Sequence, residues 1–474
     1  MNMQKIISEN IKKLYKKTFK EEVKEIYQLP PSGSSRIYFR VKSADRSVIA
    51  AYNSDKKENS AFLYLSDVFI KNGINVPEIY AEDLKTHIYL QEDLGDVTLF
   101  NRLLKVRKSN EFPEESVKLY KKVVENLAEL QIKVSDKVDY SICYPRKAFD
   151  RQSIMWDLNY FKYNFLKFTD ILFDEQLLED DFNLFSEYLL KADCNFFLYR
   201  DFQSRNIMLH NDKIYFIDYQ GGRKGALHYD LASQLYDAKA NIPENIREEI
   251  KKHYLNRLRE TYKIDVSGFD KHYYAYVLVR IMQAMGAYGY RGFFERKKHF
   301  LDSIPFAIKN LSYVLDKEEI PIEIPELRRV LKSVTDSKKL KNISGKKLTI
   351  KVSSFSYKKG IPEDKSGNGG GFVFDCRFIN NPGRIEKYKE LCGKDREVID
   401  FLENLDEANN FFKSISQIVS AAVKNYQSRG FKNLAVNFGC TGGQHRSVFF
   451  AEKTAEYLKN NYDINVELEH TEGF

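Results

Sequence analysis

Three polar residues in the middle of the chain stand at spacings that suit phosphoryl transfer. Asp201 begins a short polar loop after an apolar run, and Asn206 follows five positions later. Asp218 then ends a strand predicted over Lys213–Ile217. Transfer to a hydroxyl needs a carboxylate beside the attacking oxygen and oxygen ligands for Mg²⁺ beside the phosphates. We predict Asp201 as the base, Asn206 and Asp218 as metal ligands, and ATP and Mg²⁺ as cofactors; a surface Asx turn is the alternative.

A second stretch near the C-terminal end is suited to anions. Residues Gly439–Arg446 read Gly-Cys-Thr-Gly-Gly-Gln-His-Arg between a predicted strand and an apolar helix over Val448–Leu458. Such a turn brings together backbone N–H groups, the helix dipole and a guanidinium. The Cys440-x5-Arg446 spacing also matches cysteine phosphatases, where a lowered thiolate pKa makes sulfur a nucleophile. No acid donor is evident, so we favour anion binding over catalysis.

The elements before the first site are expected to hold a nucleotide. Residues 29–52 predict a hairpin with strands over Ile37–Val41 and Val48–Tyr52, entered by a Gly/Ser turn whose N–H groups can cover phosphates. The second strand lacks a lysine for the phosphates, although Lys56 and Lys57 lie just beyond it. Glu58 opens the next predicted helix and either pairs with such a cation or complements the helix dipole. The expected phosphate contacts are Ser32, Gly33, Ser34, Ser35 and Arg36.

Tyr199-Arg-Asp-Phe-Gln-Ser-Arg-Asn206 resembles the catalytic loop of aminoglycoside-phosphotransferase-type small-molecule kinases. Within that superfamily it is most similar to the anomeric kinases of N-acetylmuramate and N-acetylglucosamine. These kinases usually have a scaffold His where Tyr199 stands. The resemblance implies an α+β, protein-kinase-like bilobal fold for residues 1–320. It also implies that adenine binds the hinge backbone, at Gln91, Glu92 and Asp93.

The predicted helix Ser153–Phe168 carries the only tryptophan, Trp156, next to Asp157. Aromatic faces and carboxylates bind sugars, so Trp156, Asp157 and the loop residue Arg205 are expected to bind the acceptor. A tryptophan buried in the helical lobe is the alternative. His228-Tyr-Asp230 resembles the family motif that anchors a helix, and we interpret Asp230 as a structural cap that bonds to the catalytic loop.

Pro321 and Pro325 end the helical region, because prolines four apart cannot lie inside a helix. We predict a linker with one short helix over 321–346, followed by an α/β domain over 347–474. Its strands are predicted at Leu348–Tyr357, Phe372–Phe378 and Asn433–Phe438, with helices between and after them.

Four ordered motifs in this last domain resemble the C-terminal domain of RapZ-type proteins. They begin at Ser354, Phe374, Gly393 and Gly439. The resemblance implies a domain that binds an amino-sugar phosphate such as glucosamine-6-phosphate. The residues matching the family's ligand site are Asp375, Arg377, Thr441, Gly442, His445 and Arg446.

Composition limits the remaining classes. The 474 residues are too many for one compact core, and the formal charge of +8 is spread over interleaved Lys and Glu. That pattern favours a solvated surface over a nucleic-acid face. Five scattered cysteines without a C-x-x-C pair suit a reducing cytoplasm, and neither a cleavable signal nor a membrane span is predicted.

The whole chain therefore predicts an ATP-dependent sugar kinase fused to a phosphosugar-binding domain, with a sugar and an amino-sugar phosphate as its small-molecule partners. An antibiotic or choline-type phosphotransferase is one alternative, and its cationic acceptors would need an acidic pocket. A nucleotide-binding regulator with a degenerate kinase lobe is another, kept open by the missing strand lysine. The oligomeric state is left open.

Overall fold

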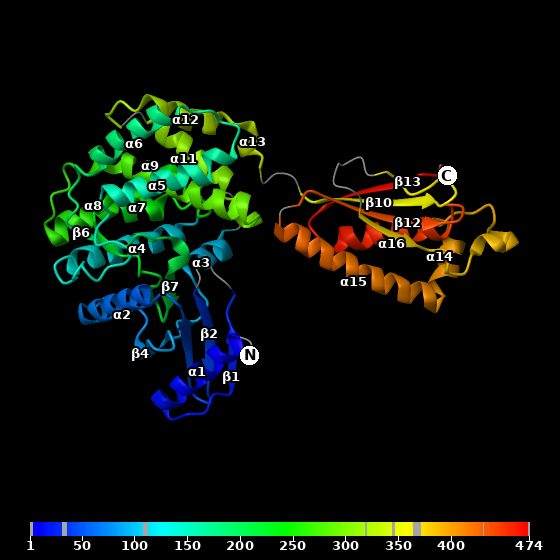
Figure 1. The fold of residues 1–474 in the computed structure, drawn as a ribbon, viewed down its shortest axis with the longest axis horizontal. Helices are drawn as coiled ribbons and strands as arrows, with labels where there is room; N and C mark the ends of the chain where they lie inside the picture. Colours follow the sequence, from blue (N-terminus) through cyan, green and yellow to red (C-terminus); the bar gives the residue numbers. More distant parts are fainter. Residues whose placement is uncertain are drawn as a thin grey trace. The chain divides into compact units, whose positions relative to one another are not determined.

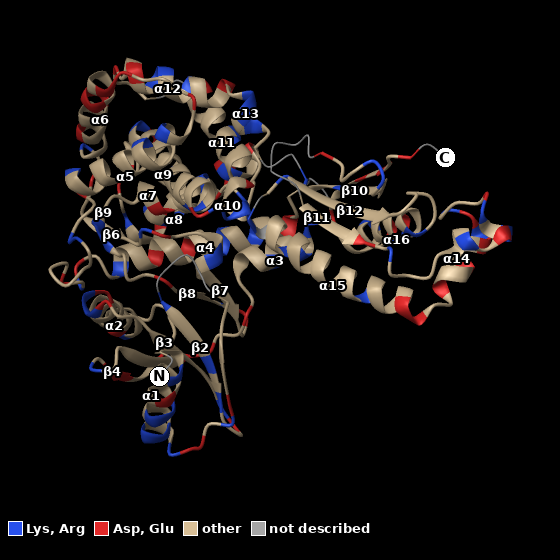
Figure 2. Cartoon of the chain, turned by 45° about the vertical axis from the view of Figure 1, so that its right-hand side comes forward, with Lys and Arg blue, Asp and Glu red and all other residues tan. Residues whose placement is uncertain are grey.

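The computed structural model describes residues 3–30, 36–107, 112–317, 320–343, 347–363, 371–429 and 431–472. The chain divides into two compact units. The first contains Met1–Ala287 and Phe306–Asp336, and the second contains Tyr288–Pro305 and Ser337–Phe474. Figure 2 shows Lys and Arg (blue) and Asp and Glu (red) scattered over the helices and strands of both units. Within the described ranges, no helix has the length and apolar character needed to cross a membrane.

The first unit begins with a lobe built on an antiparallel sheet, drawn in blue in Figure 1. Helix α1 (Met3–Phe19) packs its apolar stripe of Ile7, Ile11, Leu14 and Tyr15 on one face of the sheet. Helix α2 (Lys56–Lys71) covers the other face, where Phe62 stacks on Tyr89 with ring centroids 5.0 Å apart. The strand order is β1 (Glu25–Gln28), β2 (Ile37–Lys42), β3 (Ser47–Tyr52), β5 (Ile88–Glu92) and β4 (Ile79–Asp83).

The second lobe of this unit is helical and carries two short antiparallel sheets of two strands each. Strands β6 (Phe196–Leu198) and β9 (Arg223–Gly225) form one, and the hairpin of β7 (Ile207–His210) and β8 (Lys213–Phe216) forms the other. The β7–β8 hairpin lies in the chain between β6 and β9. The surrounding helices are α3 (Leu99–Val106), α4 (Glu114–Lys133), α5 (Arg151–Asn164), α6 (Glu175–Leu189), α7 (His228–Leu235), α8 (Glu244–Tyr262), α9 (Phe269–Tyr288) and α11 (Ile304–Asp316). The predicted bilobal fold is therefore present.

The predicted linker 321–346 contains a helix, and that helix packs on the first unit. Helix α12 (Pro325–Asp336) buries Leu327, Val330, Leu331 and Val334 along one face. The backbone N–H of Leu327 donates to Asp181 on α6 over 2.7 Å, and Glu326 accepts from the N–H of Asp174 over 2.8 Å. Proline at the first position of α12 suits a helix start, so these contacts extend the first unit to Asp336.

The second unit is an α/β domain, as predicted, and its sheet is parallel. Its order is β11 (Gly371–Asp375), β12 (Asn433–Cys440), β10 (Thr349–Ser356) and β13 (Asn465–His470). Helix α16 (Arg446–Asn461) packs on the sheet, and α14 (Arg396–Glu403) and α15 (Asp406–Arg429) extend the apolar core. The prediction lacked β13, although the alternation in Asn-Val-Glu-Leu-Glu-His is a strand signal.

Candidate functional site

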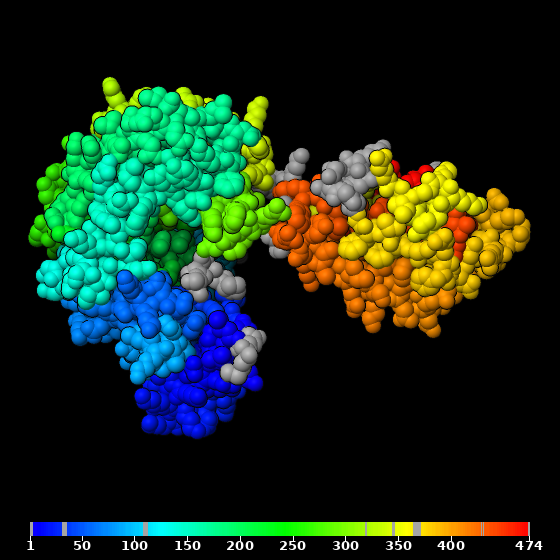
Figure 3. All heavy atoms as spheres, in the orientation of Figure 1, coloured from blue at the N-terminus to red at the C-terminus, as the bar shows by residue number. Residues whose placement is uncertain are grey.

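The three residues predicted for phosphoryl transfer lie together, where the loop before β7 meets the turn after β8. The side-chain amide of Asn206 donates to the backbone carbonyl of Asp201 over 2.9 Å and to the Asp218 carboxylate over 3.4 Å. Asp218 has a φ of 67°, in the left-handed region, which turns the chain sharply after β8. The space-filling view shows a recess where the two lobes meet, with green atoms of the middle of the chain at its base (Figure 3).

The loop before Asp201 is held by a buried carboxylate. Asp230 accepts hydrogen bonds from the backbone N–H groups of Tyr199 (2.7 Å) and Arg200 (3.0 Å) and from Gln131 (3.1 Å). Burial raises the pKa of Asp230 to about 7, against the lowering effect of these donors. The predicted bond between Asp230 and the loop is thus confirmed, although Asp230 lies inside α7 and not at its cap.

Tyr199 supports the loop in place of the family's usual histidine. Its hydroxyl donates to the backbone carbonyl of Ile217, and its ring makes edge contacts with Phe202 and Phe216 at 5.3 and 6.0 Å. The tyrosine therefore ties the catalytic loop to the residue that precedes Asp218.

The cation on the nucleotide side is Arg36, which is almost fully buried. Its guanidinium lies 3.3 Å from Glu58 of α2 and 4.0 Å from Asp218, over the ring of Phe62. Burial lowers the pKa of Arg36, but the nearby tyrosines and the two carboxylates raise it by more. The pKa therefore lies above its usual value, and the side chain keeps its charge. Lys56 and Lys57 are exposed. Arg36 and Glu58 thus form the cation–carboxylate pair for which the second strand supplies no lysine.

The oxygens around Asp218 fit a hard divalent cation. Burial and the negative charges of Asp201 and Glu58 raise the pKa of Asp218, while Gln220 and Arg36 lower it. A divalent cation would relieve this repulsion, and an Asp carboxylate beside an Asn amide offers the oxygen ligands that Mg²⁺ prefers. Across the described ranges, no three His, Cys, Asp or Glu residues cluster as a metal site. The ligand set would be Asn206, Asp218 and phosphate oxygens.

Some of the predicted ATP contacts lie outside the described residues, and the others lie in β5 or directly after it. Ser32, Gly33, Ser34 and Ser35 fall outside the described residues. Gln91 is buried in β5, and the N–H of Glu92 donates to the carbonyl of Glu78 over 2.8 Å. The Asp93 carboxylate accepts from Arg40 and Ser47, so this side chain braces the hinge within its own lobe.

All three predicted acceptor contacts have partners within the protein. Asp157 is buried and forms a two-point ion pair with Arg200, the residue before the catalytic aspartate. Its carboxylate therefore positions the loop, and the expected acceptor contact is corrected on that ground. Arg205 is exposed, with its guanidinium 4.8 Å from the ring centroid of Phe100. Trp156 is 47% exposed, which excludes the alternative of a buried tryptophan; its ring lies 5.5 Å from the Arg146 guanidinium.

The C-terminal loop has free backbone donors. Gly443 has a φ of 72°, and the carbonyls of Cys440, Thr441 and Gln444 accept from Tyr357, Ser356 and Gly393. Among the described residues, no hydrogen bond is donated by the backbone N–H groups of residues 441–445. A nest of donors at the start of a 16-residue helix favours an anion.

The predicted ligand residues of this loop fall into two groups. Arg446 is buried and donates to the carbonyls of Arg377 (2.8 Å) and Ile379 (2.7 Å), and buried His445 lies 2.8 Å from the carbonyl of Tyr388. Both side chains brace neighbouring loops, which corrects their expected direct contact with a phosphate. Thr441, Gly442, Asp375 and Arg377 are exposed; Arg377 pairs with Asp375 and lies 4.0 Å from the Tyr357 ring centroid.

Cys440 is buried and its thiol contacts the Ser447 hydroxyl at 3.2 Å. A sulfur enclosed at the end of a strand is poorly placed to attack a phosphate ester.

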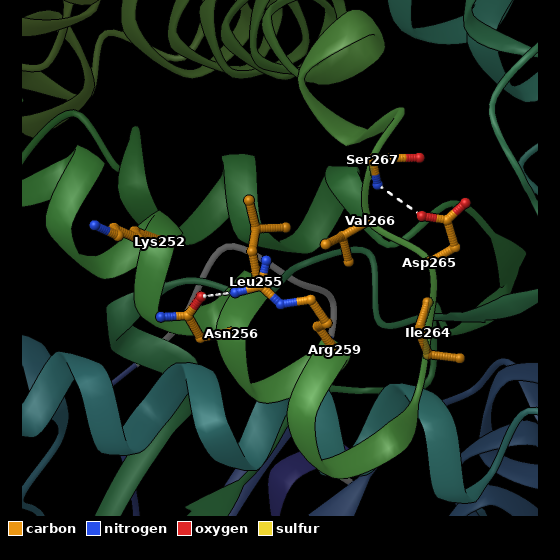
Figure 4. Close-up of a pocket in the computed structure, with 8 residues that line it drawn as sticks. All are labelled: Lys252, Leu255, Asn256, Arg259, Ile264, Asp265, Val266 and Ser267. Carbon is orange, nitrogen blue, oxygen red and sulfur yellow. Dashed lines mark hydrogen bonds between the residues drawn. The ribbon is translucent and has the colours of Figure 1, made fainter.

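One further pocket lies between α8 and the turn after it. It is lined by Lys252, Leu255, Asn256, Arg259, Ile264, Asp265, Val266 and Ser267 (Figure 4). Asp265 accepts from the N–H of Ser267 over 2.9 Å, and Arg259 donates to Asn256 over 2.7 Å. The polar groups therefore satisfy one another, and no predicted site residue lines this pocket.

Two family models cover most of the chain. The phosphotransferase enzyme family matches residues 26–264, about half of the chain, and the RapZ C-terminal domain matches residues 348–473. A nucleotide-binding protein of Thermosipho africanus is 38% identical over 122 residues, which are 26% of this chain and 42% of the relative. The nucleotide-binding protein YvcJ of Bacillus subtilis is also 38% identical over 122 residues, 26% of this chain and 40% of the relative. The chain thus spans less than half of these relatives' length.

Solved structures similar to the chain include small-molecule kinases. The choline kinase LicA of Streptococcus pneumoniae has a TM-score of 0.44 and 15% identity, covering 66% of this chain and 99% of its own. The amicoumacin kinase hAmiN has a TM-score of 0.46 and 12% identity, covering 69% and 97%.

Proposed function

Since this chain belongs to the phosphotransferase enzyme family, we propose that it transfers the γ-phosphate of ATP to a hydroxyl of an amino sugar. The anomeric hydroxyl of an N-acetylated amino sugar is the proposed acceptor position. The observation that carries the proposal is that Asn206 joins the backbone of Asp201 to the carboxylate of Asp218, with the charge of Asp201 near enough to raise the pKa of Asp218. A degenerate regulatory lobe would not need to retain all three groups, and Arg36 supplies the cation that the second strand lacks.

Each chain residue has a distinct task in the proposed reaction. Asp201 accepts a hydrogen bond from the acceptor hydroxyl and takes its proton as the oxygen bonds to phosphorus and ADP departs. Asn206 and Asp218 would hold Mg²⁺, which neutralises charge on the phosphate oxygens when bound. Arg36, paired with Glu58, is fully enclosed, and its charge offsets part of the negative charge at Asp218. Asp230 and Tyr199 keep the loop in place, so that little reorganisation is needed during transfer.

The C-terminal unit is proposed to bind an amino-sugar phosphate at the loop Gly439–Arg446. The support is the set of backbone donors at residues 441–445 and the match to the RapZ C-terminal domain. The phosphate would accept from these N–H groups, with Arg377 and Thr441 at the exposed edge. Burial of Cys440 disfavours the phosphatase alternative.

The test is ATP consumption by the full chain over a panel of free amino sugars, N-acetylated amino sugars, aminoglycosides and choline. Transfer to an amino sugar that stops on addition of EDTA is expected. Asp201→Asn should lower kcat by two orders of magnitude or more without changing the thermal midpoint, because the group acts chiefly in the transition state. Near-wild-type turnover of this variant, or turnover of choline alone, would contradict the proposal.

A further inference from the structure

A second arginine lies beside the catalytic loop and no sequence motif pointed to it. Arg223 begins β9, where it pairs in register with Leu198, two residues before Arg200. A side-chain carbon added at Gly221 would lie 3.6 Å from Cγ of Arg200 and 3.9 Å from Nη2 of Arg223. The Arg200 and Arg223 side chains therefore flank one point next to Asp201.

Arg223 is enclosed without a carboxylate partner. The residue is 5% exposed, and its Nε donates to the carbonyl of Gly221 over 2.9 Å. Over the described ranges, no Asp or Glu lies within 4.0 Å of its guanidinium, and Nη1 and Nη2 donate no hydrogen bond. Neither terminal nitrogen is among the fully enclosed, unpartnered atoms, so both face accessible space. Buried arginines are normally paired, so a partner is missing here.

The carboxylate that acts most strongly on Arg223, that of Asp157, already pairs with Arg200. Asp157 gives both oxygens to Arg200, with Nη1 to Oδ2 at 2.6 Å and Nη2 to Oδ1 at 2.5 Å. Burial and the charge of Arg200 lower the pKa of Arg223 to about 10, while Asp157 and Asp201 act in the opposite direction. The guanidinium keeps its charge at neutral pH and is under-compensated. A bound anion would recover part of the cost of burying it.

We propose that Arg223 binds an oxyanion on the acceptor, so that the acceptor is a sugar bearing a carboxylate or a phosphate and not a cationic alcohol. This rests on the proposed phosphotransferase function and narrows its acceptor class. The acceptor and not ATP is the bound partner because Arg223 belongs to β9 in the helical lobe, whereas Asp218 of the predicted metal site contacts the Arg36–Glu58 pair of the first lobe. Arg223 instead shares its surroundings with Asp157 of α5, in the helical lobe.

The electrostatics discriminate between the acceptors that the family fold can take. Ammonium groups of aminoglycosides or choline would face an unpaired guanidinium and be repelled. Neutral N-acetylated sugars would leave Arg223 without a partner. An anionic sugar is the one class that satisfies it.

The experiment compares the full-length wild type with Arg223→Gln, Arg223→Lys and the control Lys224→Gln, which removes the neighbouring charge on the same strand. Acceptors are N-acetylmuramate and glucuronate as carboxylates, glucose 6-phosphate as a phosphate, and N-acetylglucosamine as the neutral match. Arg223→Gln is expected to raise KM for the preferred anionic acceptor by about 10- to 100-fold, the loss of one charge-assisted hydrogen bond. Its KM for N-acetylglucosamine should stay within about twofold. Arg223→Lys should restore part of the loss, and Lys224→Gln should match wild type.

Binding without turnover gives a second readout. Calorimetric titration of the same sugars in the absence of ATP should give heat with an anionic sugar for wild type and a weaker Kd for Arg223→Gln. Equal losses on anionic and neutral acceptors, or a wild type that prefers the neutral sugar, would overturn the inference and leave the phosphotransferase function standing. Anion binding weakened by Arg223→Gln, without phosphoryl transfer to any sugar, would support the anion site and refute the proposed function.

Discussion

The variant Asp157→Asn tests whether the Asp157 carboxylate positions the loop before Asp201 or binds the acceptor. In the structure its two oxygens meet two nitrogens of Arg200, and the side chains are 6% and 14% exposed. Arg200 has a φ of 89°, in a region that non-glycine residues rarely adopt, so its side-chain contacts help to hold the backbone that precedes Asp201. The substitution removes the negative charge and leaves the Arg200 guanidinium buried.

The expected cost follows from this geometry. Removing one partner of a buried ion pair typically destabilises a protein by about 3–5 kcal/mol. Arg200 keeps a bond to the Tyr229 hydroxyl at 2.6 Å and ring contacts with Phe149 and Tyr229 at 5.3 and 5.0 Å. We therefore expect the lower end, about 3 kcal/mol, which corresponds to a fall of roughly 4–5 °C in the thermal midpoint for a unit of about 320 residues.

Urea unfolding and steady-state kinetics of the full chain test this, with Glu187→Gln on α6 as the control for loss of an exposed carboxylate. A double-mutant cycle with Arg200→Met should show a coupling of at least about 1.5 kcal/mol, because the second change removes the unpaired charge. If Asp157→Asn were as stable as wild type but raised KM for the acceptor alone, the carboxylate would be a substrate contact and the positioning role would be refuted.

Two further predictions concern buried polar groups. Arg446→Ala should destabilise the C-terminal unit by about 2–3 kcal/mol in thermal unfolding, because two carbonyls lose their donor. Cys440→Ser should leave glucosamine-6-phosphate binding within about twofold by calorimetry. A fully stable Arg446→Ala together with loss of binding in Cys440→Ser would contradict the bracing role. Burial raises the folded-state pKa of Asp230 to about 7, so the folded form holds a proton that the unfolded form releases above about pH 4. Wild type should therefore lose stability relative to Asp230→Asn as pH rises from 4 to 7, as measured by urea midpoints, and a flat difference would show that Asp230 is ionised throughout.

The order of Asp201, Asn206 and Asp218 was sufficient to predict that these three residues lie together. These residues lie within 18 positions, and a loop followed by one short hairpin is enough to bring them together. Local spacing and turn chemistry fix such a site, with little dependence on the rest of the fold. Hydrophobic alternation likewise predicted the β2–β3 hairpin and the strands β10, β11 and β12 of the second unit.

Tertiary structure decided which charges neutralise one another. Asp157 and Arg200 are 43 positions apart, and their pairing depends on how α5 packs against the catalytic loop. Arg446 lies in a loop typical of phosphate binding, yet its guanidinium points to carbonyls that a distant loop supplies. Arg223 has no motif, and it becomes informative only because packing buries it without a counter-ion. Charge partners are set by long-range packing, because a side chain several ångströms long can reach many neighbours and the sequence does not state which of them the fold brings within range.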